Sequence, residues 1–249
     1  MATTDSNSIP ADASGFRERD FALYRPELQR NEEYNDARLV VRRRLDAIGK
    51  AACAALSSKE VSLTSRASLH HPYTFNGYKV SSQCVYLSRG DKERKEIKRI
   101  LGVELGKDLD QNFVHVLLVL EIYQHGLEVA LRIHKDAWWD GENFKRRLKE
   151  TVNREELARV LRALPEYGLR IDEHRKVHPC ETMSPQELAE ICQFYTPGQH
   201  WLHLSRDFDC EDPFVTDPGF LERVIAEFRR LLPVYILARW SADNNRLFG

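Results

Sequence analysis

"NFVHVLLVLEIYQHGLEVALRIH", residues 112–134, is the stretch that decides the fold. Two β-rich runs flank His125 and Gly126, and glycine tolerates the positive φ angles that tight hairpin turns require. With Gln124 placed opposite Leu127, one face is wholly apolar: Val114, Val116, Leu118, Leu120, Ile122, Val129, Leu131 and Ile133. The other face holds His115, Leu117, Val119, Glu121 and Tyr123 against Glu128, Ala130, Arg132 and His134. A slip of one residue would exchange the faces, so the pattern predicts a hairpin with one face on the core.

The segments around this hairpin alternate between helical and strand patterns. Apolar residues at helical spacing predict a helix from Asp36 to about Leu56, and alternation predicts strands at 60–66 and about 80–89. The later elements expected, in order, are helices at 136–150 and 153–164 (with Asn153 and Glu156 at capping-box spacing), a strand at 167–174, a helix capped by Ser184, a strand at 199–208, and a long helix after Asp217. The segment 233–240 fits either a helix or a strand.

This order of elements predicts an α+β fold, because adjacent strands joined by a tight hairpin favour antiparallel pairing. We expect a mostly antiparallel sheet of about six strands, with helices packed mainly on one face. Residues 1–15 are small and polar, which predicts a disordered N-terminal tail, and residues 16–249 are expected to form a single α+β domain.

Composition excludes several classes of protein. The 249 residues are 42% hydrophobic and carry a net charge of -1, so no global field attracts polyanions. No apolar run approaches the ~18 residues of a membrane-spanning helix. The five cysteines are scattered without a Cys-x-x-Cys pair, which favours reduced thiols and a cytoplasmic location. Oligomeric state does not follow from the sequence.

Familiar catalytic and metal-binding motifs are missing. The sequence has no Gly-x-Gly-x-x-Gly, no phosphate-binding loop, no His-Glu-x-x-His and no Gly-x-Ser-x-Gly. These absences disfavour dinucleotide enzymes, P-loop nucleotidases, zinc proteases and α/β-hydrolases. The adjacent His70 and His71 point to opposite sides of an extended chain, so they are poor joint metal ligands. No cofactor and no metal are therefore expected.

Two features remain as candidate sites. The first is the loop "HHPYTFNGYK", residues 70–79, which is longer than an ordinary hairpin connection and rich in aromatic residues. Its rings could contact a ligand, or could anchor the loop on the core. The second is the polar face of the hairpin, where carboxylates could do acid–base work and arginines could bind anions. The candidate ligand-binding residues are Arg66, His70, His71, Tyr73, Tyr78, Arg132 and Trp139.

Three hypotheses for function follow. The leading one is a non-catalytic binding or accessory protein that recognises a protein partner or a small anionic ligand through the polar face and the 70–78 loop. The alternative is an enzyme in which Glu121 or His134 acts as general base, with Arg66 or Arg132 as anion clamp; it requires these groups to converge in a cleft. The third is a nucleic-acid-binding factor that uses Arg42–Arg44 and Lys145–Arg147.

Overall fold

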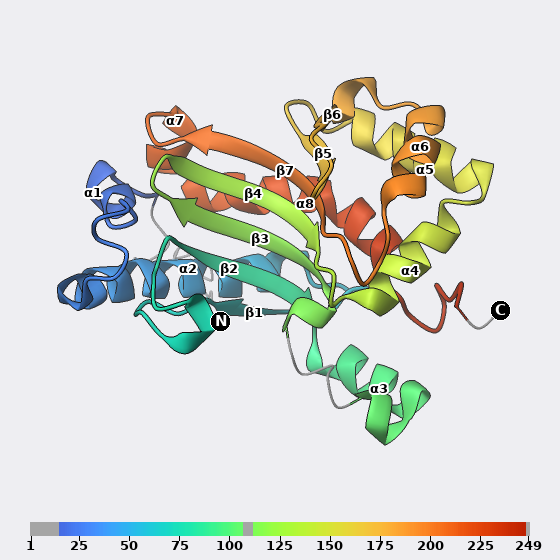
Figure 1. Ribbon diagram of the computed structural model, residues 1–249, viewed down its shortest axis with the longest axis horizontal. Helices are drawn as coiled ribbons and strands as arrows, with labels where there is room; N and C mark the ends of the chain where they lie inside the picture. Colours follow the sequence, from blue (N-terminus) through green and yellow to red (C-terminus); the bar gives the residue numbers. More distant parts are fainter. Residues whose placement is uncertain (1–14, 107–111, 248–249) are drawn as a thin grey trace, which may run out of the picture.

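The computed structural model describes residues 15–106 and 112–247, so the tail expected at 1–15 lies almost wholly outside the described residues. Seven strands form one sheet in the order β1-β2-β3-β4-β7-β5-β6, and every pairing is antiparallel (Figure 1). The strands are β1 (Leu63–Ala67), β2 (Ser82–Arg89), β3 (Val116–Tyr123), β4 (Gly126–Ile133), β5 (Gly168–Ile171), β6 (His178–Pro179) and β7 (Leu202–Asp209). The six expected strands are all present, and the two-residue β6 is the addition.

Helices cover one face of this sheet. The α-helices among the described residues are α1 (Glu18–Ala22), α2 (Asn35–Leu56), α3 (Asp91–Gly106), α4 (Trp138–Arg147), α5 (Thr151–Arg162), α6 (Pro185–Phe194), α7 (Pro213–Thr216) and α8 (Phe220–Ala238). Helix α2 packs on β1 and β2, and α8 packs on β3 and β4. Both lie behind the sheet in Figure 1, where no described helix crosses the near face of β2, β3 and β4. The α+β prediction with an antiparallel sheet is confirmed.

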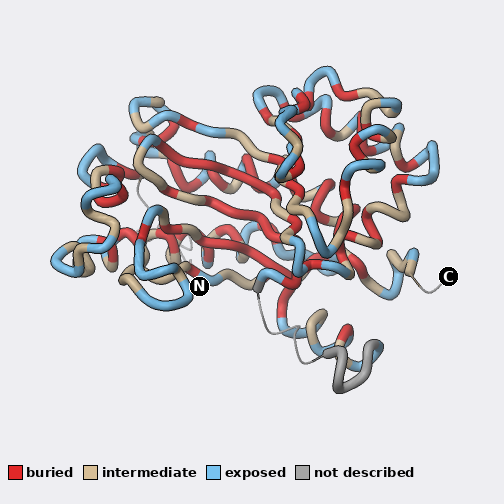
Figure 2. The backbone as a smooth tube through the Cα atoms, viewed as in Figure 1, coloured by how far each residue is buried: buried red, intermediate tan, exposed pale blue. Residues whose placement is uncertain are grey.

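The hairpin faces are as predicted, but its register is not. The apolar row is buried against the helices, and the central strands are buried along most of their length (Figure 2). Ile122 pairs with Leu127 rather than Val129, because the turn contains only Gln124 and His125. A two-residue shift leaves every side chain on its own face. Gly126 does not have a positive φ; instead a Cβ there would lie 2.0 Å from the carbonyl oxygen of Phe208 on β7.

Among three local expectations about helices, one open alternative is resolved, one prediction is corrected and one is confirmed. Residues 233–240, left open between helix and strand, belong mostly to α8, which continues through Pro233 to Ala238. Helix α5 begins at Thr151, so Asn153 lies inside the helix and does not cap it. Ser184 caps α6 as predicted, and its hydroxyl accepts a hydrogen bond from the Glu187 N–H at 3.1 Å.

A buried ion pair joins the strand ends to the chain's C-terminal segment. The Arg89 guanidinium donates to Asp140 at the start of α4, and both side chains are about 1% exposed. The same carboxylate accepts from the backbone N–H groups of Val116 and Trp240, each at 2.7 Å. Burial works to lower the pKa of Arg89, but Asp140 raises it above its ordinary value, so the guanidinium is held in its charged form.

Candidate binding groove on the open face of the sheet

The strand register sorts the uncovered face into rows of side chains. One row holds Cys84, Glu121, Glu128 and Asp207. The next holds Arg66, Tyr86, Val119, Ala130 and Ser205. The third holds Ser88, Leu117, Arg132, His203 and Arg170. A small, separate apolar cluster lies between the acidic row and the opposite end of the open face. Its members are Tyr86, Leu117, Val119 and Ala130.

The centre of the face is an ionic network around Arg132. Its guanidinium contacts the carboxylates of both Glu121 and Glu128. Arg170 adds a longer ion pair to Glu128 at 3.6 Å. Burial works to lower the pKa of Arg132, but the two carboxylates raise it. The positive charge of Arg132 is therefore already matched within the protein, and it has little left for an external anion.

His203 and Asp207 on β7 border this network. Burial, together with Arg132 and Arg170, lowers the pKa of His203 to about 3, so its imidazole is neutral at physiological pH. Burial and the Glu128 charge raise the pKa of Asp207 above its ordinary value, and Tyr123 donates to it at 3.1 Å. Among the described residues, Oε1 of Glu128, Nε of Arg132 and Nδ1 of His203 are buried without a hydrogen-bond partner.

Beside the network lies a groove of about 890 Å³ between strands β1 and β2 and the loop that joins them. Its sheet side includes Arg66, Ser68, Cys84 and Tyr86. Its loop side includes His71, Tyr73, Phe75 and Lys79, and Phe113 completes the aromatic part of the lining. No carboxylate belongs to the lining. Among the described residues, the side chains of Arg66 and Lys79 have no hydrogen-bond or ion-pair partner, and both are exposed.

Local hydrogen bonds hold the loop in shape while its aromatic rings face outward. The Asn76 side chain accepts from the Tyr73 N–H at 2.6 Å and donates to the His71 carbonyl at 2.9 Å. Gly77 follows in the left-handed region at φ +61°, and Tyr78 shares this conformation at φ +56°. Hydrogen bonds between the Asn76 side chain and the loop backbone therefore order the loop without burying its aromatic rings.

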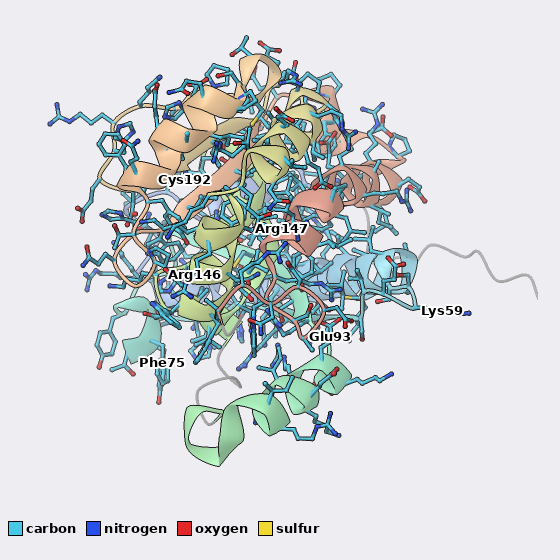
Figure 3. All side chains as sticks on the ribbon, turned by 90° about the vertical axis from the view of Figure 1, so that its right-hand side faces the viewer. Lys59, Phe75, Glu93, Arg146, Arg147 and Cys192 are labelled. Atoms are coloured by element: carbon cyan, nitrogen blue, oxygen red, sulfur yellow. The ribbon has the colours of Figure 1, made fainter. Side chains whose placement is uncertain are left out.

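Exposure of those rings overturns the idea that they anchor the loop on the core. Phe75 is 91% exposed, Tyr78 57% and Tyr73 48%. Figure 3 shows Phe75 at the margin of the molecule. Burying an aromatic ring is one of the largest favourable terms available to a folded chain. Rings left outside in this number are typical of a surface that binds something.

A series of rings continues from the groove across the sheet. Tyr86 contacts Phe113 with ring centroids 6.1 Å apart, and Phe113 contacts His134 at 5.1 Å. His134 packs on Trp201 at 3.7 Å, and Trp201 stacks on His203 at 5.4 Å. The series links β2, the start of β3, the end of β4 and the start of β7.

The structure places the predicted site residues in three separate surroundings. Arg66, His71 and Tyr73 line the groove, and Tyr78 is on the same loop outside the lining. Arg132 and Glu121 are in the ionic network. His134 accepts a hydrogen bond from the Asp136 N–H at 3.0 Å, and burial lowers its pKa.

The two remaining candidates lie elsewhere. His70 is half-buried with its pKa lowered first by burial and then by the nearby His71 and Arg42 of α2. Trp139 on α4 packs against Trp240, with centroids 5.7 Å apart. Of Arg66, Glu121, Arg132 and His134, only Glu121 and Arg132 contact each other.

The sequence analysis did not identify several residues of the groove and of the ionic network. Lys79 ends the loop that was singled out, so the loop's length was a usable signal for it. Phe113 precedes the β3 strand, and only the folded chain brings it to the groove. His203 and Asp207 join through the β4–β7 pairing, whose strands are far apart in sequence.

The basic runs are largely committed to internal contacts. Arg44 pairs with Asp20 at 2.9 Å, Arg146 pairs with Glu142 at 2.7 Å, and Arg147 donates to Asn244 at 2.8 Å. Arg146 and Arg147 are well separated from Phe75 (Figure 3). This geometry gives little support to a nucleic-acid surface built from these runs.

A second cavity, of about 550 Å³, lies between α3 and the chain's C-terminal segment. Its lining mixes both signs of charge: it includes Lys59, Glu93 and Arg147, which Figure 3 labels, and also Arg239. Glu93 and Arg239 pair at 2.8 Å. Because carboxylates such as Glu93 and Glu96 share this lining with the cations, an anion is less favoured here than in the groove, which has no carboxylate.

Within 15–106 and 112–247, no helix has the length and apolarity needed to cross a membrane. The same residues contain no group of three or more His, Cys, Asp or Glu side chains placed to hold a metal ion. The sequence matches no known protein family and no curated protein.

Proposed function

We propose that this protein is a non-catalytic binding protein whose groove, between β1, β2 and the 70–78 loop, takes an anionic ligand with an apolar or aromatic portion. One observation carries the proposal: a groove of about 890 Å³ has two uncommitted cations and several exposed rings in its lining, and no carboxylate. A cation without an internal partner is available to an external anion.

Some cations on the open face are paired with carboxylates and others are not, and this difference supports the assignment. The protein is near neutral overall, with 37 Lys and Arg against 38 Asp and Glu. Arg132 and Arg170 are matched by carboxylates, whereas Arg66 and Lys79 are not. An anion approaching the face therefore gains most at the groove.

The apolar part of the ligand is inferred from the rings. Exposed aromatic side chains provide large contact areas at a low entropic cost, and they dominate the energetics of many binding sites. Burial raises the pKa of the Cys84 thiol to about 12, so the groove's cysteine is protonated and is no nucleophile. This favours binding over covalent chemistry.

The rival proposal, an enzyme on the same face, has weaker support. It would use Glu121 or His134 as base, yet Arg132 already neutralises Glu121 together with Glu128. Its best remaining element is Asp207, whose raised pKa suits proton transfer. Asp207 is on β7, and strands β3 and β4 lie between it and the groove's β2 wall, so the two features do not form one site.

The experiment uses anilinonaphthalene sulfonate, a fluorescent anion with two ring systems, titrated into the folded protein. Arg66→Gln and Lys79→Gln should each weaken binding at least about 5-fold, since hydrogen bonds to charged groups contribute about 1.5–3 kcal/mol. Arg229→Gln is the matched control, because Arg229 is exposed on α8 on the helical side of the sheet.

Equal affinity in Arg66→Gln, Lys79→Gln and the control would reject the groove as the site. Loss of binding in all three variants would also reject it, because the effect would then be one of overall charge. Thermal denaturation of each variant checks that the fold is intact.

A further inference from the structure

We infer that the natural occupant of the groove is a short stretch of single-stranded nucleic acid; this rests on the proposed function and names its ligand class. The bases would stack on the exposed rings, and the phosphates would lie at Arg66 and Lys79. Single-strand binding sites combine stacking platforms with cations that follow the backbone, and they need little sequence-specific hydrogen bonding.

Both components, exposed aromatic rings and unpaired cations, are present in the groove. Tyr73 and Phe75 stand on the loop wall with ring centroids 5.7 Å apart. Phe113, which is 46% exposed, stands on the sheet side of the groove against the buried ring of Tyr86. Arg66 on β1 and Lys79 at the end of the loop supply the charge.

The continuing series of rings favours a polymer over a small molecule. A small anion needs one ring site, but the partly exposed Trp201, which contacts Phe113 of the groove directly and through His134, offers a further ring beyond the groove. Arg170, which is 49% exposed, lies near His203 at the far end of the series. A chain with rings at regular intervals and anionic links between them matches this arrangement.

Other anionic polymers match it less well. Phosphorylated peptides are recognised chiefly by clusters of arginine that grip one phosphate, and the groove lining has a single arginine, Arg66. A peptide added to the sheet edge would use backbone hydrogen bonds, whereas this groove is lined by side chains of the sheet face and the loop.

The test measures fluorescence anisotropy of labelled oligouridylate and oligothymidylate of about ten nucleotides, a length within the range that single-strand sites occupy. The wild-type protein should bind, with an affinity that falls as salt rises. Each phosphate contact on a single strand contributes about 0.7 to the slope of log K against log salt. Two contacts predict a slope of magnitude about 1.4, which Arg66→Gln should reduce by about 0.7.

Aromatic variants test stacking separately from charge. Phe75→Ala should weaken binding at least about 5-fold, whereas Phe194→Ala, at a phenylalanine that is 55% exposed on α6, should leave it unchanged. Trp201→Leu should weaken binding of the ten-nucleotide probe. It should leave binding of a trinucleotide unchanged, because the trinucleotide contacts only the groove. Thermal unfolding verifies each fold.

The outcomes separate this inference from the proposed function. Binding of anilinonaphthalene sulfonate without any binding of oligonucleotides would overturn the nucleic-acid assignment and leave the groove as a site for another anion. Tighter binding of a phosphorylated peptide of equal charge would also overturn it. Oligonucleotide affinity that is unchanged by Arg66→Gln and Phe75→Ala would place the nucleic acid elsewhere on the molecule. That result would also overturn the nucleic-acid assignment.

Discussion

The side chains of Arg132 and Glu128, four residues apart on β4, meet over Ala130 on the open face of the sheet. Ala130 is fully buried although no described helix covers that face. The same guanidinium holds Glu121 on the neighbouring strand. The network thus closes the middle of the face with charge that is internally balanced, and leaves the groove beside it as the place where cations remain free.

Replacing Arg132 should show how strongly the stability of the ionic network depends on this residue. Arg132→Met leaves Glu121 and Glu128 facing each other across β3 and β4, with only the longer ion pair from Arg170 to Glu128 as counter-charge. We expect a loss of about 3 kcal/mol in the free energy of unfolding, measured by urea denaturation. Arg223→Met, which breaks an exposed pair with Asp217, should cost less than about 1 kcal/mol. Equal effects of the two substitutions would show that the network is not a coupled unit.

The lowered pKa of His203 predicts a pH dependence of stability. The unfolded chain takes up a proton on this histidine near pH 6.5, but the folded protein does so only near pH 3. Stability is therefore unaffected above about pH 6.5 and falls as the pH drops from there toward 3. His203→Gln should remove about 2 kcal/mol of the difference in unfolding free energy between pH 7 and pH 5. An unchanged pH dependence in the variant would contradict this account of His203.

The buried pair of Arg89 and Asp140 offers a test of the core. Asp140→Asn leaves a fully buried guanidinium without its counter-ion, so we expect a loss of about 3–5 kcal/mol. The double variant Arg89→Met with Asp140→Asn removes both charges, keeps an acceptor for the Val116 and Trp240 N–H groups, and should be more stable than Asp140→Asn alone. Additive losses in a double-mutant cycle, measured by chemical denaturation, would show that the two side chains act independently.

The left-handed turn at Gly77 should be sensitive to a single methyl group. No atom lies within 4 Å of a Cβ built there, so a substitution acts only through the backbone at φ +61°. Gly77→Ala should cost about 1–2 kcal/mol, whereas Phe75→Ala should change stability by less than about 0.5 kcal/mol because its ring is exposed. The reverse order in thermal denaturation would mean that the loop is held by its rings.

The sequence was informative where periodicity decides the outcome. Alternation along 112–134 predicted both faces of the hairpin, because side chains on a strand alternate between core and surface. It did not predict the register, which depends on a two-residue turn and on the close approach of β7 to Gly126. A two-residue shift preserves each face, so the pattern alone does not distinguish the two pairings.

The candidate site was predictable only within its continuous segment. Arg66, His71 and Tyr73 were found because the loop and its flanking strand are contiguous in sequence. Phe113 reaches the groove through the β2–β3 pairing, and His203 reaches the ionic network through the β4–β7 pairing. Such long-range pairings leave no local pattern of residues. Trp139 was misleading for the same reason, since its partner Trp240 lies near the end of the chain.

The central claim, that ligand enters between β1, β2 and the 70–78 loop, is tested most directly by mapping backbone amide signals in two-dimensional NMR during titration with anilinonaphthalene sulfonate. We predict that the largest shifts fall between residues 66 and 86 and at Phe113, and that they vanish in Arg66→Gln. Shifts concentrated instead at the cavity between α3 and the C-terminal segment, or on the exposed sides of α2 and α8, would contradict the claim.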